Sequence, residues 1–178
     1  MRKLTVVFVL VAILTCAVSL SAQQNKPPLS PRQTTTYTFA DGKKITIDYG
    51  APSMRGRKIM GELVPYGKVW RTGANEATGF VTDADLMIGD TKVPAGKYTL
   101  YTLPGATAWQ LIVNKQTGQW GTVYNQDQDL ARIPMKVGKT SAPVEMMKIS
   151  FDGSGGTATT LNIEWENTKV SVPVKEAK

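Results

Sequence analysis

Apolar and polar residues alternate along much of this chain. Ile45, Ile47 and Tyr49 are separated by Thr46 and Asp48, so the first set would lie on one face of a strand and the second set on the other. The same pattern predicts strands at residues 98–103, 109–113, 132–137, 147–151, 161–165 and 170–174. Many short strands with almost no helical periodicity predict an all-β domain, either an antiparallel β-sandwich or a flattened barrel.

Turn-forming residues separate these strands. Asp41, Gly42 and Lys43 interrupt two alternating runs, which predicts a hairpin over residues 37–49. A second reversal is expected at Glu166 and Asn167, so that the last two predicted strands would form another hairpin. The residues expected to face the core from that hairpin are Leu161, Ile163, Trp165, Val170, Val172 and Val174, with Pro173 indicating a sheet edge.

Helical periodicity occurs in one place only, residues 57–64. Ile59, Met60, Leu63 and Val64 have the spacing of one or two helical turns, although Gly61 lies between them. The sequence therefore predicts at most one short helix, near residues 57–64.

The first 22 residues resemble a secretory signal. Arg2 and Lys3 precede an apolar run at residues 4–18, and small residues at 19–22 predict cleavage after Ala22. The run is too short and too soon followed by polar residues for a membrane anchor, and no later segment is apolar enough to span a bilayer. An alternative is lipoprotein processing before Cys16, although Thr15 is larger than the residue usual at the preceding position. We expect a periplasmic or secreted protein.

The remaining chain predicts one domain. Prolines among polar residues at 23–34 suggest an extended leader, followed by a single β-sandwich domain over residues 35–178. A chain of this size buries about two thirds of its unfolded surface, which is enough for one core. Because Cys16 is the only cysteine and would leave with the signal, no disulfide is expected.

The absence of histidine excludes several familiar chemistries. A chain with no histidine cannot form a Ser-His-Asp triad, a Cys-His pair or a histidine-containing zinc site. The glycine-rich loops that bind ATP or nicotinamide dinucleotides are also missing. Asp83 with Asp85, and Asp127 with Asp129, offer only pairs of carboxylates, which are more typical of solvated turns than of calcium sites. The sequence predicts no cofactor, no metal and no assigned catalytic residue.

The charge of the chain is mildly basic. Removal of Arg2 and Lys3 with the signal would lower the net charge from +7 to +5. Outside the cytoplasm this charge favours anionic envelope polymers, acidic sugars or lipid headgroups, and no arginine-rich tract indicates nucleic-acid binding. A general solubilising role for the charge is the alternative, and the sequence does not predict an oligomeric state.

One segment, residues 51–79, does not alternate, and it concentrates cationic and aromatic residues between glycines and prolines. Long irregular connections inside compact domains are often functional. Arginine suits carboxylate, sulfate or phosphate oxygens, while tryptophan offers a stacking face and asparagine an amide. The candidate ligand-binding residues are Arg55, Arg57, Lys58, Tyr66, Trp70, Arg71, Asn75 and Glu76.

A structural interpretation of the same segment remains open. In it Arg71 pairs internally with Glu76, Trp70 belongs to the core and Asn75 forms a turn. An enzymatic alternative is a histidine-free glycan hydrolase that uses Glu62 and Glu76 as paired carboxylates. A third is a structural or interaction module of the envelope.

A second aromatic set could also form a stacking surface for a sugar ring. It consists of Trp109, Trp120 and Tyr124. Trp109 alternates with apolar neighbours and is expected in the core. Trp120 lies in a glycine-flanked loop, where it is either exposed or closes one end of the sandwich.

The run PYGKVWRTGANE at residues 65–76 resembles the hallmark of a bacterial family of exported proteins catalogued as domain of unknown function 2911 (DUF2911). The flanking phrases KITIDYGAPSMRGRKI, PAGKYTLYTLPG, NKQTGQWG and LNIEWENTKVSVPV agree with it. The resemblance implies export and a single domain, and it supplies no activity, substrate or cofactor. We therefore expect an exported β-sandwich that binds an anionic or sugar-like ligand, such as an envelope carbohydrate, without catalysis.

Overall fold

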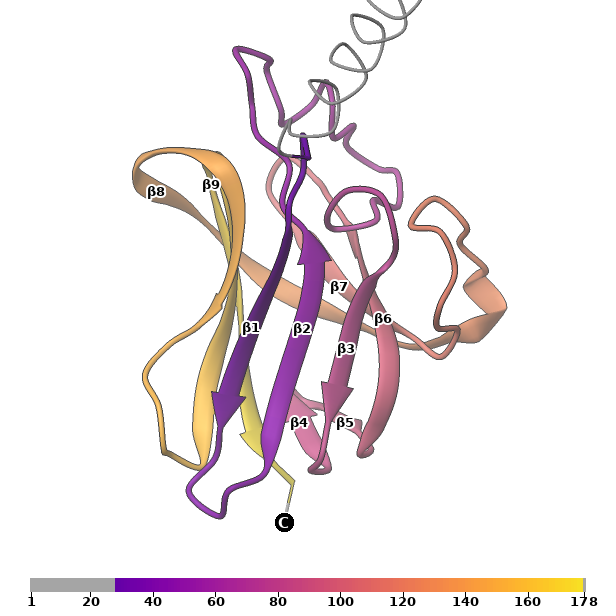
Figure 1. Cartoon of the computed structure of the whole chain (residues 1–178), viewed down its shortest axis with the longest axis vertical. Helices are drawn as coiled ribbons and strands as arrows, with labels where there is room; N and C mark the ends of the chain where they lie inside the picture. The colour runs from indigo at the N-terminus through magenta and orange to yellow at the C-terminus, as the bar shows by residue number, and fades with distance from the viewer. Residues whose placement is uncertain (1–27, 178) are drawn as a thin grey trace, which may run out of the picture.

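The computed structural model describes residues 28–177, which form nine antiparallel strands (Figure 1). The strands are β1 Arg32–Thr38, β2 Lys44–Gly50, β3 Thr78–Thr82, β4 Leu86–Ile88, β5 Thr91–Val93, β6 Gly96–Leu103, β7 Trp109–Asn114, β8 Asp129–Phe151 and β9 Ala158–Glu176. Within the described residues the only helix is a short 3-10 turn at Gln126–Gln128.

The strands follow the order β1-β2-β3-β6-β7-β8-β9-β4-β5. Strand β8 has 23 residues and belongs to both halves of this sheet. It pairs with β7 as far as Met135 and with β9 from Lys136 onward. The sheet therefore folds over on itself into two facing layers, which confirms the predicted all-β sandwich (Figure 1).

The predicted first hairpin is confirmed. Tyr37 pairs with Ile45 across β1 and β2, and Gly42 takes a φ of 89° in the connecting turn, a backbone conformation that glycine adopts without strain. Ile45 and Ile47 are fully buried, as their alternation with polar residues predicts.

The core lies between the two layers and contains residues that the sequence placed there. Trp109 is buried, as expected from its apolar neighbours in β7. The residues Leu161, Ile163, Trp165, Val170, Val172 and Val174 are all buried as well. Side chains two apart in each strand thus reach one common core from both halves of the sheet.

The predicted second hairpin at Glu166 and Asn167 is wrong. Strand β9 runs without reversal through both residues and pairs with β8 from Leu161 to Ser171. Glu166 has a φ of 55° and lies where the β8–β9 register shifts. The extra residues at this shift belong to β8, so Glu166 and Asn167 face a bulge of β8 and do not form a turn. The predicted edge position of Pro173 is also wrong, because β9 lies between β8 and β4. Pro173 comes after Ser171, the last β9 residue that pairs with β8, so its missing amide interrupts no hydrogen bond between these two strands.

The helix predicted near residues 57–64 is absent. Gly61 has a φ of 86°, which is incompatible with a helix, and the Val64 amide instead donates to the Ile59 carbonyl at 2.9 Å. The carboxylate of Glu166 accepts hydrogen bonds from the amides of Ile59 at 3.3 Å and Met60 at 3.1 Å. A long-range contact that the local sequence does not encode thus fixes these turns.

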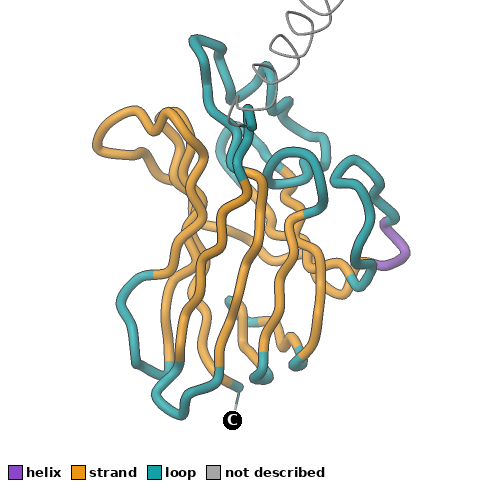
Figure 2. The backbone as a smooth tube through the Cα atoms, in the orientation of Figure 1, coloured by secondary structure: helices purple, strands orange, loops and turns teal. Residues whose placement is uncertain are grey.

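Strand β1 begins at Arg32, three residues before the predicted start of the domain. The predicted signal peptide, Cys16 and the first part of the predicted leader lie outside the described residues. Within residues 28–177, no helix has the length and hydropathy of a membrane span. The connection between β2 and β3, residues 51–77, is almost entirely loop and lies at one end of the sandwich (Figure 2).

Candidate functional site

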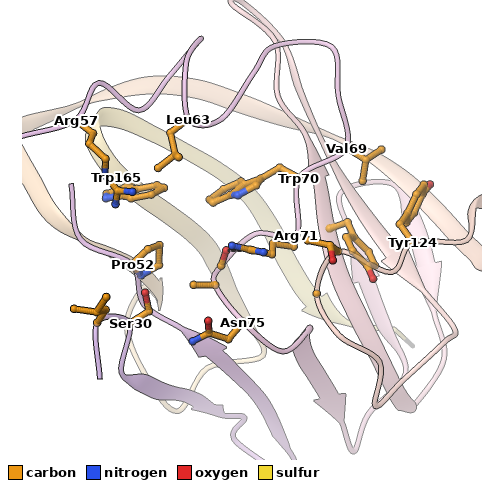
Figure 3. Close-up of a pocket in the computed structure, with 16 residues that line it drawn as sticks. Ser30, Pro52, Arg57, Leu63, Val69, Trp70, Arg71, Asn75, Tyr124 and Trp165 are labelled. Carbon is orange, nitrogen blue, oxygen red and sulfur yellow. Dashed lines mark hydrogen bonds between the residues drawn. The ribbon is translucent and has the colours of Figure 1, made fainter. Parts of the chain in front are cut away.

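An open cavity of about 530 Å³ lies beside the connection between β2 and β3. This volume is in the range of small-molecule binding sites. The cavity is lined by Leu29, Ser30, Pro52, Arg57, Leu63, Val69, Trp70, Arg71, Gly73, Ala74, Asn75, Tyr101, Gly121, Thr122, Tyr124 and Trp165. Four of the eight predicted site residues are therefore brought together here, namely Arg57, Trp70, Arg71 and Asn75 (Figure 3).

Backbone hydrogen bonds hold residues 70–75 against the sheet. The amide of Trp70 donates to the Thr102 carbonyl at 2.8 Å, and the amide of Ala74 donates to the Gly50 carbonyl at 3.1 Å. A Cβ atom on Gly50 would overlap the Ala74 carbonyl oxygen, so this close approach requires glycine. The segment is thus fixed by β6 on one side and by the end of β2 on the other.

The guanidinium of Arg71 extends into the cavity (Figure 3). Its Nε donates to the carbonyl of Gly73 at 3.0 Å, while no protein partner is found for its terminal nitrogens among residues 28–177. No described carboxylate lies within 4.0 Å of this guanidinium. The expected ion pair between Arg71 and Glu76 is wrong, because Glu76 lies instead 3.5 Å from Arg32.

Tryptophans separate the cavity from the core. The ring of Trp70 stacks on Trp165, with a centroid distance of 5.9 Å and an angle of 15°, and meets Trp109 edge to face at 6.4 Å. Trp165 is 2% exposed, and its Nε1 donates to the Glu145 carbonyl at 3.2 Å. Trp70 is partly buried and packs on the core. Trp70 therefore packs on the core, as the structural interpretation expects, and it also lines the cavity.

The connection between β7 and β8, residues 115–128, forms another wall. Its Gly121 donates to the carbonyl of Asn75 at 3.0 Å. A Cβ atom at Gly121 would lie 2.7 Å from that carbonyl oxygen and 2.9 Å from Cδ of Arg71, so glycine allows the two loops to touch. Asn75 itself has a φ of 65°, which agrees with the expected turn-forming role, yet its side chain also lines the cavity.

Two tyrosines complete this wall with hydroxyls that are already engaged. The Tyr124 hydroxyl donates to Asp129 at 2.6 Å and accepts from Nη2 of Arg132 at 2.7 Å. Burial, followed by the hydrogen bond to the Asp129 carboxylate, raises the pKa of Tyr124 to about 12. The Tyr101 hydroxyl donates to the Val123 carbonyl at 2.6 Å and accepts from Gln119 at 3.0 Å, and burial raises its pKa as well. Both groups stay protonated near neutral pH.

Arg57 also lines the cavity, but most of its guanidinium is committed. Its Nε donates to the Met54 carbonyl at 2.9 Å and its Nη2 to the Ser53 carbonyl at 2.7 Å. Arg57 therefore stabilises its own loop. Its charge still adds positive potential to the cavity without a direct contact to a ligand.

The other predicted residues do not line the cavity. Arg55 donates from Nη2 to the Leu29 carbonyl at 2.7 Å, and Lys58 pairs with Glu62 at 3.3 Å on the loop surface. Tyr66 is exposed and lies beside Gly61, where an added Cβ would be 3.1 Å from the ring. Glu76 faces Arg32. Arg55, Lys58, Tyr66 and Glu76 therefore lie on the outer surface of the loops, where three of them form contacts within the protein.

Several lining residues were not predicted. Trp165 was expected only in the core, and Tyr124 was assigned to a different aromatic set that also contained Trp120. Trp120 is 50% exposed, so it does not close one end of the sandwich. The sequence offered no indication that residues 115–124 lie beside Arg71, since that contact arises from the pairing of Glu76 with Trp120 across two loops.

The cavity contains no paired carboxylates. No aspartate or glutamate lines it, and both Glu62 and Glu76 contact surface cations instead. Among the described residues no group of three or more acidic, histidine or cysteine side chains could hold a metal ion. Three of the four aspartates in the predicted carboxylate pairs accept from protein groups: Asp83 from the Lys44 amide, Asp85 from the Ala95 amide and Asp129 from Tyr124.

Comparison with known proteins gives a family but no characterised relative. Neither a search of curated proteins nor a search of solved structures found a match. The family model described as "Protein of unknown function (DUF2911)" matches residues 30–174. This match covers every residue that lines the cavity except Leu29, and nearly all of the described chain. The protein therefore belongs to the DUF2911 family.

Proposed function

We propose that this domain is a non-catalytic binding protein for a small anionic or sugar-like ligand, which occupies the cavity beside Arg71. The observation that carries the proposal is the state of the Arg71 guanidinium. It projects into an open cavity with one hydrogen bond to a carbonyl and no carboxylate partner among the residues described.

An arginine in this position favours an anion for a simple reason. A guanidinium that is partly removed from water loses hydration, and an anionic ligand restores the lost interactions with charge-assisted hydrogen bonds. Trp70, Leu63 and Val69 add apolar surface to the same cavity, and apolar surroundings strengthen electrostatic attraction by lowering the local dielectric constant. Asn75 adds an amide that can donate to or accept from the same ligand.

The alternatives have less support. A glycosidase needs an acid and a second carboxylate across the scissile bond, and neither is among the lining residues. An envelope interaction module would not need a cavity with an unpaired cation. Export to the periplasm or the exterior remains a proposal that rests on the apolar run at residues 4–18.

The test is a binding measurement on the mature protein and on two variants. Isothermal titration with inorganic phosphate and with glucuronate should give binding to the wild type. The variant Arg71→Met should bind the same anions at least tenfold more weakly, because it keeps the aliphatic stem and loses the charge-assisted hydrogen bonds, which contribute roughly 1.5–3 kcal/mol.

The matched control is Lys58→Met. It removes one positive charge from the same connection, yet Lys58 is exposed and does not line the cavity. Its affinity for both anions should stay within about twofold of the wild type, since exposed charges are screened by salt. Equal losses in the two variants, or no anion binding by the wild type, would refute the proposal.

A further inference from the structure

Three of the polar side chains that line the cavity are already engaged by protein groups. The hydroxyls of Tyr101 and Tyr124 each donate to and accept from a protein group. Arg57 uses its Nε and Nη2 on backbone carbonyls. The groups left for a ligand are the side chains of Ser30, Asn75 and Thr122 and the terminal nitrogens of Arg71, and Arg71 alone among these four carries a charge.

The geometry of Arg71 narrows the choice further. Its Nε is engaged by the Gly73 carbonyl at 3.0 Å, so the side of the guanidinium that contains Nε is closed to a ligand. The two terminal nitrogens form the remaining fork, and such a fork matches the two oxygens of one carboxylate. The site thus provides for one anionic head, not for charges spread over a ligand.

Apolar side chains form a large part of the remaining lining. Leu29, Pro52, Leu63, Val69 and Trp70 contribute hydrocarbon surface. Leu29 is 70% exposed and Leu63 is 45% exposed, so both have apolar surface that a ligand can cover. A ligand with an apolar body would cover them, and this burial is favourable in proportion to the apolar area removed from water.

A polyhydroxylated ligand suits this lining less well. Each ring hydroxyl that leaves water needs a hydrogen-bond partner, and an unpaired one lowers affinity. The tryptophans also offer at most one free face, because Trp165 is 2% exposed and one face of the Trp70 ring is stacked on it. Carbohydrate recognition by ring stacking would require an accessible aromatic face.

We infer that the ligand of this cavity is an amphipathic carboxylate, with its anionic head on the terminal nitrogens of Arg71 and an apolar body against Leu29, Leu63, Val69 and Trp70. The inference rests on the proposed function and selects one ligand class within it. In this inference two features of the site determine its affinity for a ligand, namely the charge of Arg71 and the apolar surface beside it.

Four probes separate charge from apolar area. Octanoate has both a carboxylate and a hydrocarbon body, octanol lacks the charge, acetate lacks the body, and glucuronate replaces the body with hydroxyls. Isothermal titration of the mature protein at constant ionic strength should rank octanoate first, at least tenfold tighter than each of the other three.

Two variants assign the determinants to residues. In Arg71→Met, octanoate and octanol should bind with equal affinity, because the charge no longer distinguishes them. In Leu63→Ser, octanoate should bind at least threefold more weakly while acetate is unchanged, because only the longer ligand reaches the apolar wall. Lys58→Met is the control for net charge, and thermal midpoints within a few degrees of the wild type show that each variant is folded.

The outcomes separate this inference from the proposed function. If glucuronate binds as tightly as octanoate, and both depend on Arg71, the ligand class is wrong while anion binding stands. If acetate matches octanoate, the apolar determinant is wrong. If octanol matches octanoate in the wild type, or no probe depends on Arg71, both the inference and the proposed function are refuted.

Discussion

Two arginines near the same cavity wall, Arg132 and Arg71, differ in how far the protein satisfies their guanidinium groups. Arg132 donates from Nε to Asp129 at 2.9 Å and from Nη2 to the Tyr124 hydroxyl at 2.7 Å, and Asp129 also accepts from Asn114 at 2.9 Å. Within residues 28–177, Arg71 donates only to the Gly73 carbonyl. The first arginine is part of a closed network that braces residues 115–128, whereas the second faces a cavity.

The difference lies in where the nearest carboxylate points. Asp129 precedes Arg132 by three residues and projects toward it, so the pair closes locally. Glu76 is five residues from Arg71, but the backbone turns at Asn75, with its φ of 65°, and Glu76 faces Arg32. The tertiary surroundings of an arginine therefore decide whether it braces the fold or is free to bind a ligand. Three substitutions test this contrast.

The largest effect is expected from Asp129→Ala. Asp129 accepts from Tyr124, Arg132 and Asn114, so its loss leaves three donors without their acceptor. We expect the free energy of unfolding to fall by about 3 kcal/mol, since each such hydrogen bond contributes roughly 1 kcal/mol and the donors left behind are partly buried. Urea denaturation at neutral pH measures this.

The control is Asp127→Ala, which changes an exposed aspartate two positions earlier. Its unfolding free energy should stay within about 0.5 kcal/mol of the wild type, as is usual for surface substitutions. An Asp129→Ala variant as stable as this control would show that the network around Arg132 is not a brace.

A smaller effect is expected from Tyr124→Phe, at about 1 kcal/mol near neutral pH because one hydroxyl is lost. This tyrosine has a pKa of about 12 in the folded protein against 10.0 ordinarily. Its contribution is therefore complete below pH 10 and is lost as the pH rises through 12, because the unfolded chain releases its proton first.

The measurement is urea denaturation between pH 8 and about 12. The wild type should lose stability over the upper part of this range, and Tyr124→Phe should lose less over the same interval. Some decline persists in the variant, because burial also raises the pKa of Tyr49 and Tyr101. Identical profiles would contradict the assignment of the shift to Tyr124.

The smallest effect on stability is expected from Arg71→Met. The variant keeps the stem that packs on Gly121 and loses one hydrogen bond to a carbonyl, so its unfolding free energy should change by less than about 1 kcal/mol. Urea denaturation in the absence of ligand measures this. A loss of about 3 kcal/mol or more, equal to that of Asp129→Ala, would make Arg71 an internal clamp like Arg132.

The sequence by itself determined the fold class and most of the core. Alternation placed Ile45, Ile47, Trp109 and Trp165 on buried faces, because a strand exposes every second side chain to the same side. The turn at residues 41–43 was also predicted correctly, because the need for a glycine at its positive φ depends only on neighbouring residues. The unusual composition of residues 51–79 also indicated where the cavity lies, and Trp70, Arg71 and Asn75 were identified from it.

The tertiary structure decided what local patterns do not encode. Residues 57–64 form turns in which the carboxylate of Glu166, far along the chain, accepts from the amides of Ile59 and Met60. Glu166 itself lies within β9 and does not end a strand. The cavity needs residues 115–124 beside Arg71, a contact that exists only once two separate loops meet at Gly121. Alternation is a property of neighbouring residues, whereas a bulge, a buried acceptor and an unpaired guanidinium depend on which distant segments the folded sheet brings together.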